Sequence, residues 1–94
     1  METLVTDILK DLGITEKQAM RNFALLNASQ KAVEFEQDCE ALESKYKMSF
    51  KEFEKKLNSQ DKEVFEQEDD YLAWKFAVEG YDFWSQRVKQ LKNN

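Results

Sequence analysis

Carboxylates are the most abundant reactive groups of this chain, so they are considered first. One segment holds five of them, Glu34, Glu36, Asp38, Glu40 and Glu43, and Glu36 and Glu40 are one helical turn apart. Carboxylate-bridged metal sites in helical bundles combine glutamates with Glu-x-x-His motifs on facing helices. The sequence contains no histidine. We therefore interpret the segment as solvated charge and expect neither a metal ion nor another cofactor.

The lack of histidine also limits catalysis. It removes the commonest general base and every Ser-His or Cys-His nucleophile arrangement. The chain has no glycine-rich phosphate loop either. Cys39 occupies a position of a hydrophobic repeat between Phe35 and Leu42, so we predict that it is a small buried hydrophobic residue. We expect a protein that is not an enzyme.

An acidic run followed by an aromatic stretch is the strongest candidate for a binding surface. The acidic run consists of Glu63, Glu66, Glu68, Asp69 and Asp70. The aromatic stretch, YLAWKFAVEGYDFWSQRVKQL, begins at Tyr71. One interpretation of the acidic run is a solvated face near a helix N-terminus, where carboxylates suit the helix dipole. The alternative is a docking surface on which carboxylates attract a basic protein and aromatic side chains anchor it. The predicted partner-binding residues are Glu66, Asp69, Asp70, Tyr71, Trp74, Tyr81 and Trp84.

Five lysines form a basic cluster, which we call the lysine corner, and Glu52 and Glu54 lie among them. They are Lys45, Lys47, Lys51, Lys55 and Lys56. This cluster is either a solvated corner or a patch that contacts phosphate. The net charge is −5, from 19 acidic and 14 basic residues. It argues against duplex binding, for which Lys and Arg supply most of the affinity. A nucleic-acid-associated regulator is therefore only our third hypothesis.

The elements that must position these residues are helices. The chain has no proline and two glycines, which predicts an all-α fold, because small strand-rich folds need frequent turn residues. We expect one domain, 1–94, with helices at 2–12, 16–46, 49–57 and 61–92. Gly13 suits the left-handed position after the first helix. Asp61 is the predicted N-cap of the last helix.

Two sequence signals predict capping boxes at helix starts. Thr15 is followed three residues later by Gln18, and Ser49 by Glu52. A turn is therefore expected near Lys47. The helices 16–46 and 61–92 would each be roughly 45 Å long at 1.5 Å per residue. Matched lengths joined by a short helical corner predict an antiparallel hairpin.

A heptad repeat in the second helix predicts the surface that faces the last helix. Its members are Leu25, Ala28, Ala32, Phe35, Cys39, Leu42 and Tyr46. In the last helix, Ala73, Ala77 and Gly80 form a strip of small residues that would let another backbone approach. That approach is either to the second helix or across a dimer, and the sequence does not separate the two.

The apolar surface of residues 71–91 is wider than one partner helix covers, so we expect a homodimer that buries it. Our first hypothesis is a protein-binding module, and the main alternative is a structural protein that uses its aromatic stripe only for self-assembly. The single cysteine excludes an internal disulfide and indicates a reducing, cytoplasmic location. Neither an export signal nor an apolar run long enough for a membrane span is recognisable.

Three stretches carry a resemblance to a known class of proteins. DLGITEKQA, KYKMSFKEFEKKL and EDDYLAWKFAVEGYDFWSQRVKQL resemble small helical proteins of bacteria and archaea that look like antitoxins of type II toxin–antitoxin pairs. The resemblance implies a non-enzymatic protein that binds and silences a cognate toxin, often a ribonuclease. Ribonucleases are usually basic, so an acidic helix edge would suit such a partner. No functional residue is carried over from that class.

Overall fold

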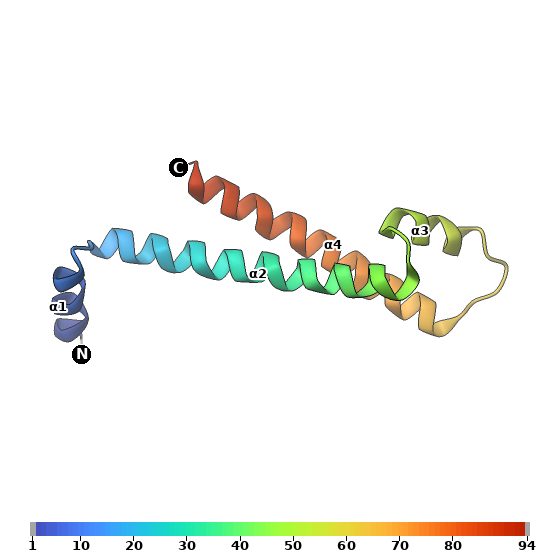
Figure 1. The fold of residues 1–94 in the computed structure, drawn as a ribbon, viewed down its shortest axis with the longest axis horizontal. Helices are drawn as coiled ribbons and strands as arrows, with labels where there is room; N and C mark the ends of the chain where they lie inside the picture. Colours follow the sequence, from blue (N-terminus) through green and yellow to red (C-terminus); the bar gives the residue numbers. More distant parts are fainter. Residues whose placement is uncertain (1, 94) are drawn as a thin grey trace.

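The computed structural model describes residues 2–93 and shows an all-α chain, as the sequence predicts (Figure 1). Its helices are α1 (Glu2–Leu12), α2 (Glu16–Tyr46), α3 (Phe50–Asn58) and α4 (Phe65–Lys92). α2 and α4 lie antiparallel, α3 packs on α4 at one end, and α1 turns away from the other end. We call the α3 end the closed end and the α1 end the open end.

Helix starts follow the predicted capping boxes. The hydroxyl of Thr15 accepts a hydrogen bond from the backbone N–H of Gln18 at 3.1 Å, and the Gln18 side chain accepts one from the Thr15 N–H at 2.9 Å. Ser49 and Glu52 make the same reciprocal pair at the start of α3. Each pair satisfies two backbone donors that the helix leaves open, so both predictions are confirmed.

Two residues in the left-handed region end α1 and α2. Gly13 has φ of 71°, and the N–H groups of Gly13 and Ile14 bond the carbonyls of Lys10 and Leu9. This is a Schellman motif, which favours glycine at that position. Lys47 ends α2 with φ of 54° although it carries a Cβ. The turns predicted at Gly13 and near Lys47 are thus present.

The last helix begins later than predicted. Asp61 was expected to cap it, but α4 starts at Phe65, and Val64 precedes it without a side-chain cap. Residues 59–64 instead form the loop that connects the end of α3 to the start of α4 (Figure 1). Because α3 folds back beside α4, the chain needs an irregular segment to span the gap between the two helix ends. The predicted helix start at 61 is therefore wrong.

The heptad repeat of α2 faces α4 as expected. All seven of its residues are buried or half-buried, and Ala28 is the most enclosed. Of the strip of small residues on α4, Ala77 is buried and Gly80 half-buried at this surface, whereas Ala73 is exposed. A Cβ built on Gly80 would lie 2.8 Å from three ring carbons of Phe35. The close approach at Gly80 is therefore to α2 of the same chain.

The hydrophobic core is concentrated at the closed end. Phe53 of α3 and Trp74 of α4 are almost completely buried, at 0% and 1% exposure. Tyr46 packs on both rings, with centroid separations of 4.2 Å to Phe53 and 6.2 Å to Trp74. Phe50 stands edge-on to Trp74 at 5.6 Å. Aromatic contacts of this kind hold α2, α3 and α4 together at one point.

The chain is far more extended than a typical domain of its size. It measures 64 × 27 × 17 Å, and its Cα radius of gyration is 19.8 Å, whereas about 12 Å is typical for this length. Its accessible surface of 7720 Å² exceeds the roughly 5,700 Å² expected for its mass by roughly 2,000 Å². Within the described residues, no helix is long and apolar enough to cross a membrane.

Candidate protein-binding surfaces

The structure places two of the predicted aromatic anchors inside the hairpin. Trp74 belongs to the core, so its side chain is not available at the surface in this conformation. Tyr71 is half-buried, stacks on Phe50 at 5.6 Å and donates a hydrogen bond of 2.6 Å to Glu54. That bond to a carboxylate raises the pKa of Tyr71, because the neutral hydroxyl is the donor. Both side chains hold α4 against α3.

Two of the predicted acidic anchors are engaged by α2. The ammonium of Lys45 lies 2.6 Å from Asp70 and 2.8 Å from Glu66, and the hydroxyl of Tyr46 donates to Asp70. The hydrogen bond from Lys45, followed by that from Tyr46, lowers the pKa of Asp70. The pKa of Lys45 is raised by its bonds to Asp70 and then Glu66. Burial and the bond to Asp70 raise the pKa of Tyr46 to about 12. This ion-pair cluster joins α2 to α4.

The remaining predicted anchors lie apart from that cluster. Asp69 is exposed, and Tyr81 is exposed in the middle of α4. Trp84 is half-buried against α2 and stands edge-on to Phe83 at 5.1 Å. The seven residues therefore do not form one surface. Four of them stabilise the closed end, and the other three are distributed along α4.

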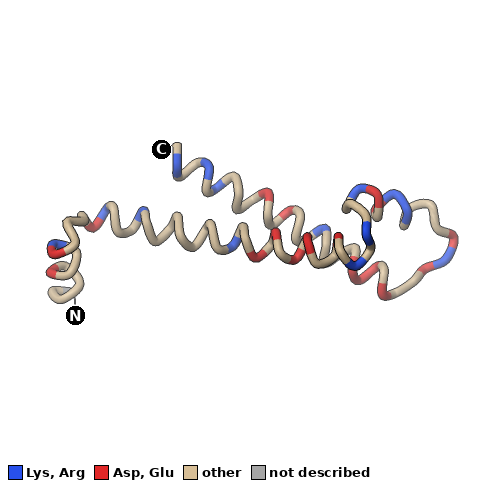
Figure 2. The backbone as a smooth tube through the Cα atoms, viewed as in Figure 1, with Lys and Arg blue, Asp and Glu red and all other residues tan. Residues whose placement is uncertain are grey.

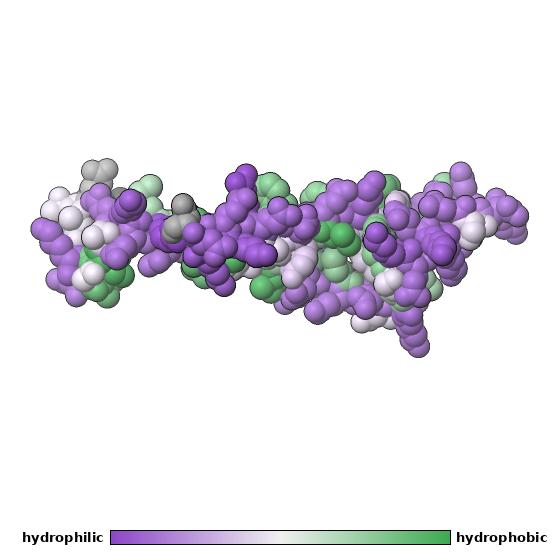
Figure 3. Space-filling model, turned by 90° about the horizontal axis from the view of Figure 1, so that it is seen from above, coloured by the Kyte–Doolittle hydropathy of each residue, from purple (hydrophilic) through white to green (hydrophobic). Residues whose placement is uncertain are grey.

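Exposed apolar side chains mark the surface that remains. The structure exposes large hydrophobic residues on three helices, and patches of them interrupt the polar surface (Figure 3). On α1 they are Leu4, Val5, Ile8 and Leu12; on α2 they are Met20, Phe23, Leu26 and Val33; on α4 they are Phe65, Leu72, Phe76, Tyr81 and Phe83. Monomeric proteins rarely leave so much apolar surface uncovered, and such surface usually marks an interaction site.

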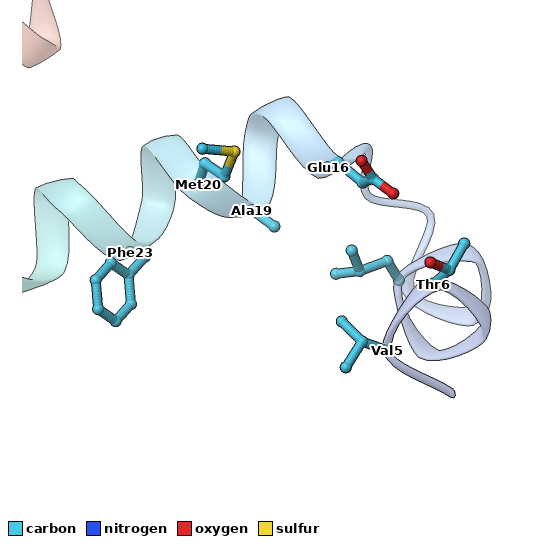
Figure 4. A pocket seen from close by; sticks show the side chains of 7 residues that line it. Val5, Thr6, Glu16, Ala19, Met20 and Phe23 are labelled. Carbon is cyan, nitrogen blue, oxygen red and sulfur yellow. The ribbon is translucent and has the colours of Figure 1, made fainter. Parts of the chain in front are cut away.

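An open groove lies between α1 and α2 at the open end. It has a volume of about 890 Å³ and is lined mainly by apolar side chains. Val5 of α1 and Ala19 and Phe23 of α2 face the space between the two helices (Figure 4). Met20 and Phe23 are 73% and 69% exposed. We call this feature the α1–α2 groove. It was not among the predicted sites, although the apolar repeat of residues 2–12 was visible in the sequence.

A second apolar stripe runs along an exposed flank of α4, beside the face that packs on α2. It contains Phe65, Leu72, Phe76 and Phe83, at spacings of seven, four and seven residues. Phe76 contacts Phe35 edge-on at 5.4 Å yet remains 66% exposed. We call it the α4 outer stripe. Its residues were recognisable in the sequence as a helical stripe but were not predicted as a binding site.

The candidate reactive groups named from the sequence, the thiol of Cys39 and the carboxylates of residues 34–43, lie on α2. Cys39 is half-buried, and burial followed by the neighbouring acidic side chains raises the pKa of its thiol, which disfavours the reactive thiolate. The five carboxylates of residues 34–43 are exposed around α2. Among the residues that the structure describes, no group of three or more potential ligands could hold a metal ion.

The lysine corner is mixed in charge. The ammonium of Lys45 forms ion pairs with Glu66 and Asp70. The groove beside Lys47 is also lined by three carboxylates, those of Glu40, Glu43 and Glu52. Hydrogen bonds from Ser49 lower the pKa of Glu52 and keep it ionised. These negative charges oppose the binding of phosphate groups at this corner.

Comparisons with protein-family models, with curated proteins and with solved structures found no significant match to this chain.

Proposed function

We propose that the chain is a non-enzymatic protein-binding module that binds helical partners, including a second copy of itself, through the apolar surfaces that one chain leaves exposed. The observation that carries the proposal is the excess of about 2,000 Å² of accessible surface, together with the apolar groove at the open end. Burial of apolar area is the dominant favourable term in association, so surfaces of this composition gain most from a partner.

The α1–α2 groove is the surface on which we propose that a different protein binds. Its walls come from two helices, and beyond the groove α2 carries two further exposed apolar residues, Leu26 and Val33. An amphipathic helix of a partner can lay its apolar face in such a groove. α1 makes few contacts with the rest of the chain, so it can adjust to what binds.

A basic partner is favoured by the acidic segment that follows Val33 further along α2. Residues 34–43 hold five exposed carboxylates and no lysine or arginine. Complementary charge of this kind increases association rates and excludes acidic competitors. The chemistry agrees with the resemblance to antitoxins, whose partner would be a basic toxin. We therefore propose an antitoxin-like role as the specific form of the function.

The test is the mass of the protein in solution, alone and after mixing with the product of the adjacent gene at about 10 μM. Light scattering should show a larger complex, and Phe23→Ser should weaken its formation at least about tenfold, because Phe23 lines the groove. Val64→Ser is the matched control, since Val64 is 41% exposed but lies at the closed end, outside the α1–α2 groove and the α4 outer stripe. A wild-type protein that stays a monomer and binds no neighbour would refute the function.

A further inference from the structure

The α4 outer stripe has the pattern of a coiled-coil seam. Leu72 and Phe76 are separated by four residues and Phe76 and Phe83 by seven, which keeps all three on one side of a helix. They are 64%, 66% and 50% exposed. α2 contacts the neighbouring face of α4, through the buried Trp74 and Ala77, and touches the stripe at the ring of Phe76, which stays 66% exposed. A second helix can therefore lie along the outer stripe without displacing α2.

Charges of alternating sign border this stripe on one side. Glu68, Lys75, Asp82 and Lys89 recur at intervals of seven residues, so they line up along the same flank of α4. The change of sign along the helix is visible in Figure 2. Lys75, Asp82 and Lys89 are exposed, and Glu68 is half-buried. Asp82 accepts a hydrogen bond from Gln86 through one carboxylate oxygen, which leaves the other for a cation.

We propose that a second copy of this chain binds along the α4 outer stripe, with the two α4 helices antiparallel and crossing near Val78. In this register Phe83 packs on Leu72 of the second copy, and the same contact recurs on the other side of the two-fold axis. Lys75 lies opposite Asp82 of the second copy, and Glu68 lies opposite Lys89 of the second copy. Each pair occurs twice, so four pairs of opposite charge border the seam.

The opposite orientation is unfavourable for the same sequence. In a parallel pair each residue of the stripe meets its own counterpart, which places Asp69 against Asp69 and Glu79 against Glu79. Lys75 would then lie near Gly80 and find no carboxylate. Like charges at a seam destabilise it, whereas complementary flanking charges set the orientation of coiled coils. The charge pattern of α4 therefore selects the antiparallel dimer.

The exposed area agrees with a dimer of this size. Stable homodimer interfaces bury about 1,000 to 2,500 Å² on each subunit. One chain exposes roughly 2,000 Å² more than a compact protein of its mass. The pairing also leaves the α1–α2 groove free, because that groove lies on other helices. The dimer and the binding of a different protein are thus compatible.

This inference rests on the proposed function, since both treat exposed apolar surface as an interface. Charge reversal separates them. We expect the 94-residue chain to have twice its mass of 11.2 kDa in analytical ultracentrifugation. Lys75→Glu alone and Asp82→Lys alone should each raise the dimer dissociation constant about tenfold, because two attractive pairs become repulsive. An equimolar mixture of the two variants should recover the affinity. In the heterodimer, the new glutamate at position 75 faces the new lysine at position 82, and the native Asp82 faces the native Lys75.

A pair of apolar substitutions provides the control. Phe83→Ser should dissociate the dimer, whereas Phe23→Ser should leave it intact, and far-UV circular dichroism would confirm that both variants remain helical. A dimer that loses affinity in the charge variants without recovery in the mixture would overturn the antiparallel register. A dimer that depends on Phe23 rather than Phe83 would overturn the choice of surface. A monomeric protein that binds no neighbour would instead refute the proposed function itself.

Discussion

Single residues decide how closely α2 and α4 approach. Gly80 lies directly beneath the ring of Phe35, and no other residue type leaves room for that ring. A glycine inside a helix costs about 1 kcal/mol relative to alanine. The sequence showed this cost and indicated a close approach, but it could not name the helix involved. The ring of Phe35 accounts for the glycine, because it fills the space that a Cβ would occupy.

We predict that Gly80→Ala destabilises the protein by about 1 kcal/mol. Alanine gains helix propensity, but its Cβ would lie 2.8 Å from three ring carbons of Phe35, and overpacking of this kind costs about 1–3 kcal/mol. Urea unfolding measures the difference. In a Phe35→Leu background the ring is absent, so Gly80→Ala should become neutral or stabilising. The same loss of stability in both backgrounds would show that Phe35 is not the obstacle.

Pairs of helices are held together by a few directed contacts as well as by the heptad repeat. The cluster of Lys45, Tyr46 and Asp70 ties the end of α2 to the beginning of α4. Its residues were assigned from the sequence to separate roles, in a basic corner, in the heptad repeat and in a docking surface. The carboxylate of Asp70 brings these roles together. Spacing within one helix could not predict a contact that depends on how the two helices are aligned.

The Asp70 cluster predicts a loss of stability in acid. The pKa of Asp70 is lowered in the folded protein. Its contribution is therefore fully present above the ordinary pKa of an aspartate, and it disappears as the pH falls through the lowered value. Urea midpoints measured between pH 2 and pH 6 should fall in acid, and Asp70→Asn should flatten that dependence. Asp69→Asn, at an exposed neighbour, is the control and should leave the dependence in place.

Tyr46 predicts a loss of stability of the α2–α4 pair at high pH. Its pKa is raised to about 12 from an ordinary value near 10. A raised pKa stabilises the fold below the ordinary value, and the contribution is lost as the pH rises from about 10 to about 12. Tyr46→Phe removes the titrating hydroxyl but keeps the ring that packs on Phe53. The variant is therefore a control that separates titration of the cluster from loss of aromatic packing.

The whole molecule is uneven in its packing. Buried side chains are concentrated at the closed end, around Phe53 and Trp74, whereas Leu4, Leu12 and Met20 at the open end remain exposed. Regions with few buried contacts open locally with little free energy. The extended shape therefore combines a stable aromatic corner with an end that can rearrange. This division suits a protein whose open end binds a partner.

Hydrogen exchange should reveal this unevenness in the protein on its own. We predict that amides of α1 and of residues 16–24 exchange about two orders of magnitude faster than those of residues 39–46 and 70–77. Peptide-level mass spectrometry measures both regions in one experiment. Addition of a partner that binds the α1–α2 groove should slow exchange at the open end only. Equal protection of both ends in the isolated chain would contradict the uneven packing.

The sequence by itself determined which segments are helical, apart from the start of α4, because helix formation depends on local patterns. The capping boxes at Thr15 and Ser49, the left-handed Gly13 and the heptad repeat of α2 were all readable from residue types and spacing. Only the tertiary structure decided which aromatic residues are core and which are surface. Trp74 and Phe83 both belong to helical apolar stripes of α4, yet Trp74 is buried and Phe83 is 50% exposed. Burial depends on where α2 and α3 lie beside α4, and that arrangement arises from the packing of the whole chain.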